Sequence, residues 1–537
     1  MKRLFPAVIA AALAIAPAIT ARAAGSSTLN FQLVGSNALY NRGMNAAPAV
    51  YDHAMYIGSR TDGTHPHAGV LVVDIADPAN PTIAGEIGAP DEGLPSSTSR
   101  ELRVWPQQKL LIVMNFQCSA ILHACASPAD ANGSAISNFT FYDLSDELHP
   151  AKVATYKPSR TPHEMFLWVD PAHDGRALLY FTGPSSSVTN PNLLVADISK
   201  ARQNVFTETV KWSANDQYTA DERNNLDVRL HSIGVSIDGT RMYLAYLGGG
   251  FEVADTSDLA AGKADPKIRL ITSVGNRIPA ATQVGTHSSV KVPGRALVLT
   301  TDEVYGDSVD AVTGEDHGCP WGWVRLIDIA DEAHPKLAGE YKMPQNYKTY
   351  CDGPDGQDKQ NTYFTSYSAH NPTVIGDLAF VTWHSDGLQA ISLTDPTHPV
   401  QVGQFMPETL PYVVTEDPSL SLGKAKVVAW SYPIIRSGLI YFVDIRNGLF
   451  VVRYTGPHAD EVNAISFYEG NSNLGDAAHL EHPASVLSRR IERAPALASA
   501  ARRPLPTTGA EDALWPALVL FAVAVALGWR VRRRGPA

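Results

Sequence analysis

Four histidines stand at one recurring place in this chain, at the start of a short apolar run. They occur in Thr161-Pro-His163-Glu164, Arg229-Leu-His231-Ser232, Gly285-Thr-His287-Ser288 and Ser368-Ala-His370-Asn371. Imidazoles that converge on one point suit a transition metal ion, and copper, zinc and iron all accept nitrogen ligands. The pattern predicts a metal site made of these four histidines, and either Glu101 or Glu164 could complete or orient the set.

A second interpretation of the histidines stays open. One histidine per repeat could do a structural job, such as bonding the backbone of a neighbouring sheet. Two further signals are weaker. Thr301-Asp302-Glu303 at a strand end could bind a cation, although a pair of acids there is usually a solvated turn. His65-Pro-His67 and His384-Ser-Asp386 lie in equivalent loops that either face the same rim or are simply polar. The chain has no Gly-x-Ser-x-Gly, phosphate loop, His-Glu-x-x-His or dinucleotide fingerprint, so no reaction class follows from a motif.

A repeated sequence phrase shows which structural elements must position these histidines. Four full copies begin at Val70, Phe139, Val324 and Leu388, and the first reads Val-Leu-Val-Val-Asp-Ile-Ala-Asp-Pro-Ala-Asn-Pro. Each copy follows two apolar runs and precedes a Pro-marked turn and another run. Four short strands per unit, repeated along the chain, are typical of a β-propeller blade, whose first strand lines a central channel.

The repeat predicts an all-β, seven-bladed propeller over residues 30–465. Six or eight blades remain open, because the first and last units could share strands to close the ring. The predicted units, numbered one to seven in chain order, are residues 30–91, 95–158, 160–216, 225–278, 282–346, 362–412 and 425–465.

Aspartates recur inside the phrase and invite a catalytic interpretation. They are Asp74, Asp143, Asp197, Asp255 and Asp328. Each precedes a turn, where an Asp side chain caps by bonding its own backbone two residues on. We therefore expect these aspartates to be structural.

The phrase resembles the LVIVD repeat, which forms propellers in secreted and surface-anchored prokaryotic proteins. The resemblance covers nearly all of residues 30–465 and implies a fold, but no single activity. The placement of the histidines also resembles that in the selenium-binding protein and methanethiol oxidase group. That resemblance implies copper and the oxidation of a small thiol.

Both ends of the chain indicate export to a surface. Residues 1–23 read as a signal peptide, with Lys2 and Arg3, an apolar run and Ala21-Arg22-Ala23 as the cleavage site. At the other end an apolar stretch, Ala513 to Trp529, precedes four arginines and predicts a membrane span with a cytoplasmic tail. Residues 466–504 read as a stalk.

The pentapeptide before this stretch, Leu505-Pro506-Thr507-Thr508-Gly509, completes a resemblance to the sorting signal of sortase substrates, residues 505–537. The resemblance implies cleavage between Thr508 and Gly509 and attachment to the cell wall through Thr508. A plain membrane anchor is the alternative, and both place the protein at the cell surface.

Charge and cysteine content narrow the partners and the compartment. The formal net charge of −11 disfavours nucleic acid as a partner. An even number of cysteines, four, favours disulfides in an exported chain, and we expect Cys118–Cys125 and Cys319–Cys351.

Two functions remain open on this basis. The first is a surface-held binding module for an extracellular protein, a glycan or a small ligand, with or without a metal ion in its channel. The second is a secreted metal-dependent oxidoreductase that uses copper or another metal. The sequence does not settle whether the protein is an enzyme.

Overall fold

The computed structural model describes residues 28–88, 97–117, 124–125, 137–282, 284–304, 318–358 and 363–481. Most strands form antiparallel groups of four. In chain order these are β3–β6 (Asn45–Tyr51, Ala54–Ser59, Val70–Asp74, Thr82–Ile87), β7–β10 (Ser97–Trp105, Leu110–Gln117, Asn138–Asp143, Ala151–Tyr156), β11–β14 (Met165–Val169, Ala177–Thr182, Leu193–Asp197, Thr207–Trp212), β15–β18 (Ser232–Val235, Arg241–Ala245, Phe251–Asp255, Arg269–Leu270), β19–β22 (Thr286–Lys291, Leu297–Asp302, Val324–Asp328, Lys336–Tyr341) and β23–β26 (Ala369–Ile375, Leu378–Trp383, Gly387–Ser392, Val400–Phe405).

A further sheet combines strands from both ends of the described chain. It contains β27 (Ile434–Arg436), β28 (Leu439–Asp444), β29 (Gly448–Tyr454), β30 (Phe467–Tyr468) and β2 (Phe31–Asn37). β2 pairs antiparallel with β29, and β1 (Thr28–Leu29) pairs with the outer edge of β26. The strand β2, predicted as part of unit one, thus completes the sheet of unit seven. Closure by a strand from the other end of the repeat removes the exposed edges that an open ring would have.

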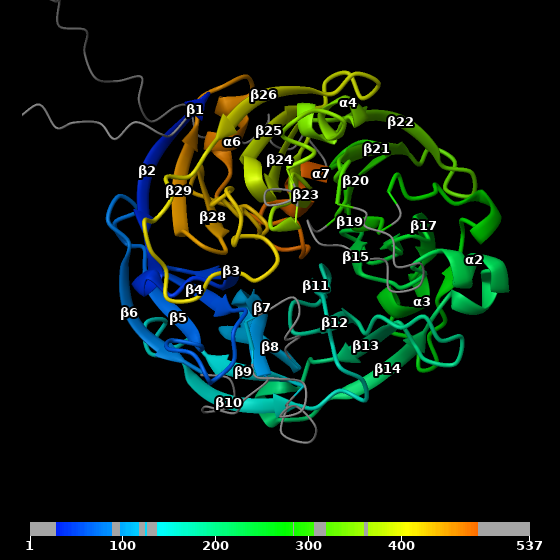
Figure 1. Ribbon diagram of the computed structural model, residues 1–537. Helices are drawn as coiled ribbons and strands as arrows, with labels where there is room; N and C mark the ends of the chain where they lie inside the picture. The colour runs from blue at the N-terminus through cyan, green and yellow to red at the C-terminus, as the bar shows by residue number, and fades with distance from the viewer. Residues whose placement is uncertain are drawn as a thin grey trace, which may run out of the picture. The chain divides into compact units, whose positions relative to one another are not determined.

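The sheets stand around one axis, with β7, β11, β15, β19 and β23 innermost (Figure 1). The strands β6, β10, β14, β22 and β26 lie at the rim (Figure 1). This is a β-propeller-like arrangement, and the prediction of an all-β repeat fold is confirmed. The groups β3–β6 and β7–β10 also touch through the pair Ser59 and Ser99.

Helices are short and lie in the connections. The α-helices are α2 (Ala220–Asn225), α3 (Ser257–Ala260), α4 (Lys348–Cys351), α6 (Ala459–Ala464) and α7 (Ala477–Glu481). The 3-10 turns are η1 (Leu39–Asn41), η3 (Pro106–Gln108), η4 (Ala201–Gln203), η5 (Asn215–Gln217), η6 (Val274–Asn276), η7 (Pro344–Asn346) and η8 (His384–Asp386).

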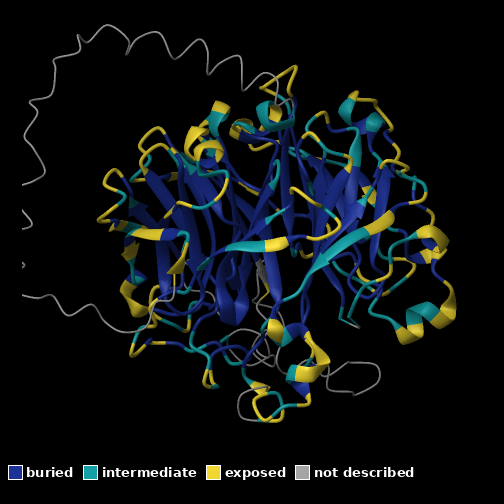
Figure 2. Ribbon diagram, turned by 90° about the horizontal axis from the view of Figure 1, so that it is seen from above, coloured by how far each residue is buried: buried dark blue, intermediate teal, exposed yellow. Residues whose placement is uncertain are grey.

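The apolar runs of the sequence form strands that are buried on both faces. All six residues of β12 are buried, whereas the rim strand β6 alternates between exposed and partly exposed residues. Figure 2 shows this contrast between a buried interior and exposed loops. The core lies between neighbouring sheets; one cluster, for example, joins Trp168 of β11 to Leu244 of β16. Packing on both faces explains why apolar and polar residues do not alternate along these strands.

The repeated aspartates hold turns, as expected. Each ends the third strand of its unit, and its Oδ1 accepts a hydrogen bond from the backbone N–H two residues later. The donors belong to Ala76, Ser145, Ser199, Ser257 and Ala330, at 2.8–2.9 Å. The local hydrogen bond fixes the chain reversal toward the rim strand.

Residues 466–481 differ from the predicted stalk, because they pack against the propeller. Asn473 donates to the backbone oxygen of Val169 at 2.7 Å and accepts from its N–H at 2.8 Å. Ser472 forms a parallel bridge with Leu167, and Arg103 Nε donates to Asn471 O at 3.4 Å. This segment therefore contacts inner strands of units two and three.

Several predictions fall wholly or partly outside the described residues. These are the signal peptide 1–23, the remainder of the stalk, the sorting signal 505–509 and the apolar stretch to Trp529. No helix within the described ranges is long and apolar enough to span a bilayer. The disulfide Cys319–Cys351 is present, and Cys125 is disulfide-bonded, while its predicted partner Cys118 lies outside the described residues.

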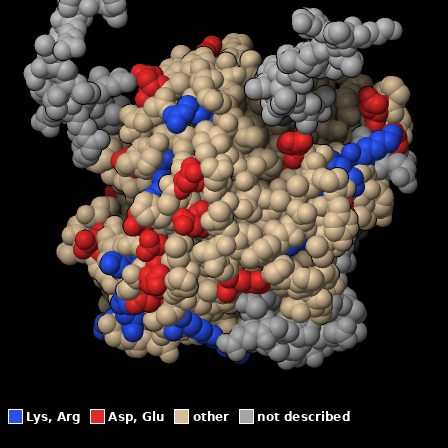
Figure 3. Space-filling model, turned by 90° about the vertical axis from the view of Figure 1, so that its left-hand side faces the viewer, with Lys and Arg blue, Asp and Glu red and all other residues tan. Residues whose placement is uncertain are grey.

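Charged side chains of both signs are interspersed on the face seen in Figure 3. One exposed pair joins neighbouring units, since Arg202 lies 3.1 Å from Asp143. The hydrogen bonds from Arg202 and Ser145 lower the pKa of Asp143 to about 2. The folded state therefore favours the ionised carboxylate.

This pair predicts a pH-dependent contribution to stability. Asp143→Asn should lower the free energy of unfolding by about 1 kcal/mol at pH 7, where the carboxylate is ionised in both states. The difference should shrink as the pH falls from about 4 toward 2, because the native carboxylate is then protonated. Urea unfolding at several pH values measures it, with Asp265→Asn as the exposed control. An Asp143→Asn deficit that stays constant down to pH 2 would contradict this assignment.

Candidate metal centre

Backbone irregularities at the start of the inner strands turn particular side chains toward the channel. The register shifts between Thr286 and Ser288 in β19 and between Ala369 and Pro372 in β23. The histidines 287 and 370 sit inside these bulges. A bulge re-aims a side chain that regular pleating would send to another face. Arg100 occupies the same place in β7, between Ser99 and Glu101.

His163 and His231 lie just before their strands and are held by main-chain bonds. The N–H of His163 donates to Thr182 O, and that of His231 donates to Ala245 O, both at 2.8 Å. Each acceptor ends the second strand of the same unit. The two histidines therefore occupy matching positions in units three and four.

Hydroxyl groups of one unit fix the histidine backbone of the next. Thr182 Oγ1 donates to His231 O at 2.7 Å, and Ser232 Oγ donates to His287 O at 2.8 Å. Thr301 Oγ1 donates to His370 O at 2.6 Å. Because each bond crosses between sheets, the spacing of the imidazoles follows from the packing of whole units.

The structure brings all four predicted histidines into one row. Ring centroids lie 4.6 Å apart for His163 and His231, 4.1 Å for His231 and His287, and 4.2 Å for His287 and His370. His384 extends the row, with its ring 4.9 Å from that of His370. Residues up to 83 positions apart thus become neighbours.

At one end of this row, three of the histidines surround Glu303. Its Oε1 is 3.2 Å from Nε2 of His370 and 3.2 Å from Nε2 of His384, and its Oε2 is 3.4 Å from Nε2 of His287. All four side chains are buried. We call His287, Glu303, His370 and His384 the inner set.

Two histidines of the inner set have their second ring nitrogen engaged. His370 Nδ1 lies 2.6 Å from Trp430 O, which can only accept. His287 Nδ1 lies 2.8 Å from Ser288 Oγ, whose hydroxyl donates onward to Asn371 Oδ1. Both Nδ1 atoms therefore carry the hydrogen in the neutral ring, and both Nε2 lone pairs face Glu303. Histidines that bind metals show this arrangement.

Burial keeps these histidines neutral. It lowers the pKa of His231 to about 3 and that of His370 to about 4, although Glu303 acts to raise both. Burial also lowers the pKa of His287 well below its usual value. Burial raises the pKa of Glu303, but the positive charge of protonated His287 or His370 outweighs this and holds that pKa well below the ordinary range. Burial thus favours neutral imidazoles, while an ionised Glu303 favours a cation beside it.

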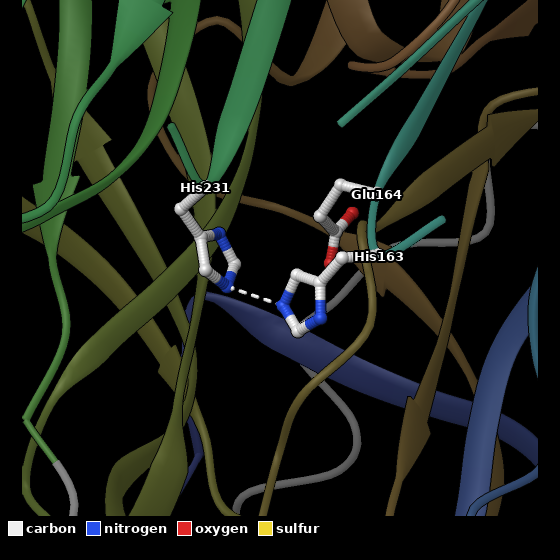
Figure 4. A group of neighbouring side chains, drawn as sticks. All are labelled: His163, Glu164 and His231. Carbon is white, nitrogen blue, oxygen red and sulfur yellow. Dashed lines mark hydrogen bonds between the residues drawn. The ribbon is translucent and has the colours of Figure 1, made fainter. Parts of the chain in front are cut away.

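His163, Glu164 and His231 form the other end of the row, which we call the outer set (Figure 4). Nε2 of His163 lies 2.8 Å from Nε2 of His231, and one ligand atom of each of the three residues lies within 4.8 Å of the others. His163 is partly exposed, whereas Glu164 and His231 are buried. Burial raises the pKa of Glu164 well above its usual value, and Glu101 adds to this. A metal ion bound here would displace a proton.

Glu101, the other acid expected to complete the set, has a different neighbour. Its Oε2 lies 3.3 Å from the Arg103 guanidinium, and both side chains are almost fully buried. Within the described residues, Glu101 belongs to none of the clusters whose ligand atoms lie within 4.8 Å of one another. The structure therefore supports a structural ion pair for Glu101.

Arginines line the channel opposite the histidines. The guanidinium groups of Arg60 and Arg100 lie 4.8 and 5.0 Å from the ring centroid of Trp430. That ring also lies 4.9 Å from His370. Arg60 is 3.7 Å from Asp417, and Arg100 is 3.5 Å from Glu164. The channel therefore has an imidazole side and a cationic side.

Glu303 and His384 lie in segments that the local sequence marks only weakly, yet a repeat signal for them exists. The inner–second strand pairings place Asp302 opposite Thr286, Trp383 opposite Ala369 and Ser59 opposite Asn45. The next residues, Glu303, His384 and Arg60, are therefore equivalent. Comparing the residues that leave second strands, as well as those that begin first strands, would have found them.

Residues 66–87 match the family model of the LVIVD repeat. This match supports a repeat protein with a β-propeller-like fold. The search of curated proteins found no match.

Two solved structures are distantly similar to this chain. Chaetomium thermophilum Raptor aligns over 80% of this chain and 30% of its own, with 10% identity and a TM-score of 0.45. A hypothetical selenium-binding protein from Sulfolobus tokodaii aligns over 56% of this chain and 66% of its own, with 11% identity and a TM-score of 0.38. This chain thus spans less than two thirds of either protein.

The contrast between Glu101 and the histidine row can be tested. Glu101→Gln should lower the free energy of unfolding by about 3 kcal/mol, because it leaves the buried charge of Arg103 without its counter-ion. The metal content of the folded variant should equal that of the parent protein. Thermal unfolding and elemental analysis measure the two quantities. Lost metal with unchanged stability would instead make Glu101 a ligand.

Proposed function

We propose that this protein is an exported, surface-held, seven-bladed β-propeller that binds a transition metal ion in its channel. The inner set, His287, Glu303, His370 and His384, holds the ion. Copper, zinc and iron suit a set of three imidazoles and one carboxylate. The bound ion makes the propeller a metal-dependent binding module.

The proposal rests on one observation: histidine nitrogen lone pairs point at the buried Glu303 carboxylate. His287 and His370 direct Nε2 lone pairs at the Glu303 carboxylate, and neither contact has hydrogen-bond geometry. Facing acceptors repel unless a cation lies between them. Tetrahedral bonds of about 2.0–2.2 Å separate ligand atoms by roughly 3.3–3.6 Å. The separations of 3.2 Å from Glu303 Oε1 to Nε2 of His370 and to Nε2 of His384 fit such an ion after small adjustments, whereas His287 contacts the other carboxylate oxygen and clusters with His231.

Burial favours binding over chemistry at the inner set. Ligand atoms of Glu303, His370 and His384 lie within 4.8 Å of one another, and His287, which clusters with Glu303 and His231, would have to move to complete a tetrahedral site of four protein ligands. The inner set is also buried, so a substrate has little direct access. A metal-dependent oxidoreductase would need another open position.

The count of seven blades rests on the strand groups and on ring closure. Six groups follow one another from β3 to β26, and β27–β29 with β2 complete the series. The predicted alternative, in which the first and last units share strands, agrees with the pairing of β2 and β29.

Surface attachment rests on the sequence alone, through the order of Leu505-Pro506-Thr507-Thr508-Gly509, apolar stretch and arginines. If a sortase processes this signal, changing Thr508 to Ala should release the protein from the wall fraction into the membrane fraction. Immunoblots of fractionated cells measure this, with Thr507→Ala as the control at the variable position. An unchanged distribution for Thr508→Ala would leave a plain membrane anchor.

Metal content tests the central proposal. The purified protein, loaded with Zn²⁺ or Cu²⁺ and desalted, should retain metal bound by the inner set. His370→Ala and His384→Ala should each lower its affinity by about 100-fold or more, because each removes a ligand. His398→Ala is a matched control, since this exposed histidine contacts the turn residues Asp395 and Thr397, far from the channel residues in sequence.

Stability measurements keep this test interpretable. Thermal unfolding of each variant without metal shows whether the fold survives, and His384→Asn offers a smaller change should alanine disturb it. If the folded variants His370→Ala and His384→Ala retain metal as tightly as His398→Ala does, the inner set is structural.

A further inference from the structure

We propose that the outer set, His163, Glu164 and His231, is a second metal site with a coordination position open to water or a small anion. This inference rests on the proposed metal-binding function of the channel. It places the open coordination position at the His163 end of the histidine row.

The outer set shares no residue with the cluster Glu303–His370–His384, so each can hold an ion of its own. His231 lies between them, with its ring 4.1 Å from that of His287, and it also clusters with His287 and Glu303. The Nε2 atoms of His163 and His231 face each other at 2.8 Å, and the Glu164 carboxylate lies beside His163 (Figure 4). Where a shared hydrogen joins two such nitrogens, a metal ion can replace it if they move apart by about half an ångström.

The partly exposed side chain of His163 has room for that movement, although its backbone N–H is held by Thr182 O. Glu164 is 3% exposed, and its Oε1 has no hydrogen-bond partner within the described residues, with the Arg100 guanidinium 3.5 Å away. A buried carboxylate beside two imidazole nitrogens has unused capacity to bind a cation.

Three donors make this site different in kind from the inner set. Two histidines and one carboxylate leave at least one position for an exogenous ligand, as in catalytic zinc sites and non-haem iron sites. The partly exposed His163 lies at this open end. The inner ion would be enclosed, and the outer ion would contact solvent.

The charges around the outer set predict which ion leaves first. Arg100 lies 3.5 Å from Glu164 and competes with a cation for that carboxylate. Arg103 faces Glu101, so this second pair adds little net charge. The outer ion therefore has fewer ligands, a competing cation and more solvent, and a mild chelator should remove it before the inner ion.

Copper loading of the full-length protein tests the inference. Elemental analysis should find two Cu²⁺ per chain, and added azide should give a charge-transfer band, because azide can bind only at an open position. His163→Ala should bind one Cu²⁺ and lose the azide band. His384→Ala should also bind one Cu²⁺ but keep the band. His334→Ala, an exposed turn histidine, should match the parent protein.

The variants separate this inference from the proposed function. One Cu²⁺ in the parent protein, lost in His384→Ala and retained in His163→Ala, would overturn the second site and support the inner one. One Cu²⁺ lost only in His163→Ala would support the outer site and overturn the inner one. An azide band that persists in His163→Ala would overturn the open position. Should His163→Ala fail to fold, Glu164→Gln is the second variant, with the same expected loss of one Cu²⁺.

Discussion

Hydrogen bonds between neighbouring units at the start of the inner strands determine the geometry of the channel. Thr182, Ser232 and Thr301 each donate to the backbone carbonyl of the histidine in the next unit. These bonds fix the histidine backbone, and bulges in β19 and β23 fix where the ring points. A change in sheet packing would therefore move the imidazoles as a group, and small errors would accumulate along the row.

Buried charge gives this geometry its chemical consequence. Asp417 faces Arg60, and Glu101 faces Arg103, so these buried carboxylates have guanidinium partners. Glu303 instead faces imidazoles that burial keeps neutral. A buried anion needs a compensating charge, and protonating several buried histidines is costly. A metal ion can supply that charge while using the lone pairs that point at the carboxylate.

The sequence predicted the repeat, the strands and the phase of four histidines, because these depend on local pattern. The turn role of Asp328 and its equivalents followed from the same local chemistry. The sequence did not show that β2 closes the last sheet or that Asn473 binds Val169, since both contacts join segments hundreds of residues apart. Glu303 did not stand out in the sequence, because a pair of acids at a strand end is usually solvated. Only the closed ring of sheets places this carboxylate against imidazoles.

The two ends of the histidine row differ in a way that bears on the two proposed ions. The row runs from the partly exposed His163 to the buried His384. An ion that enters beside His163 meets three donors first, and each further step along the row offers another imidazole until Glu303 supplies the fixed negative charge. The geometry that encloses one ion thus leaves the other in contact with solvent, where exchange and ligand binding can occur.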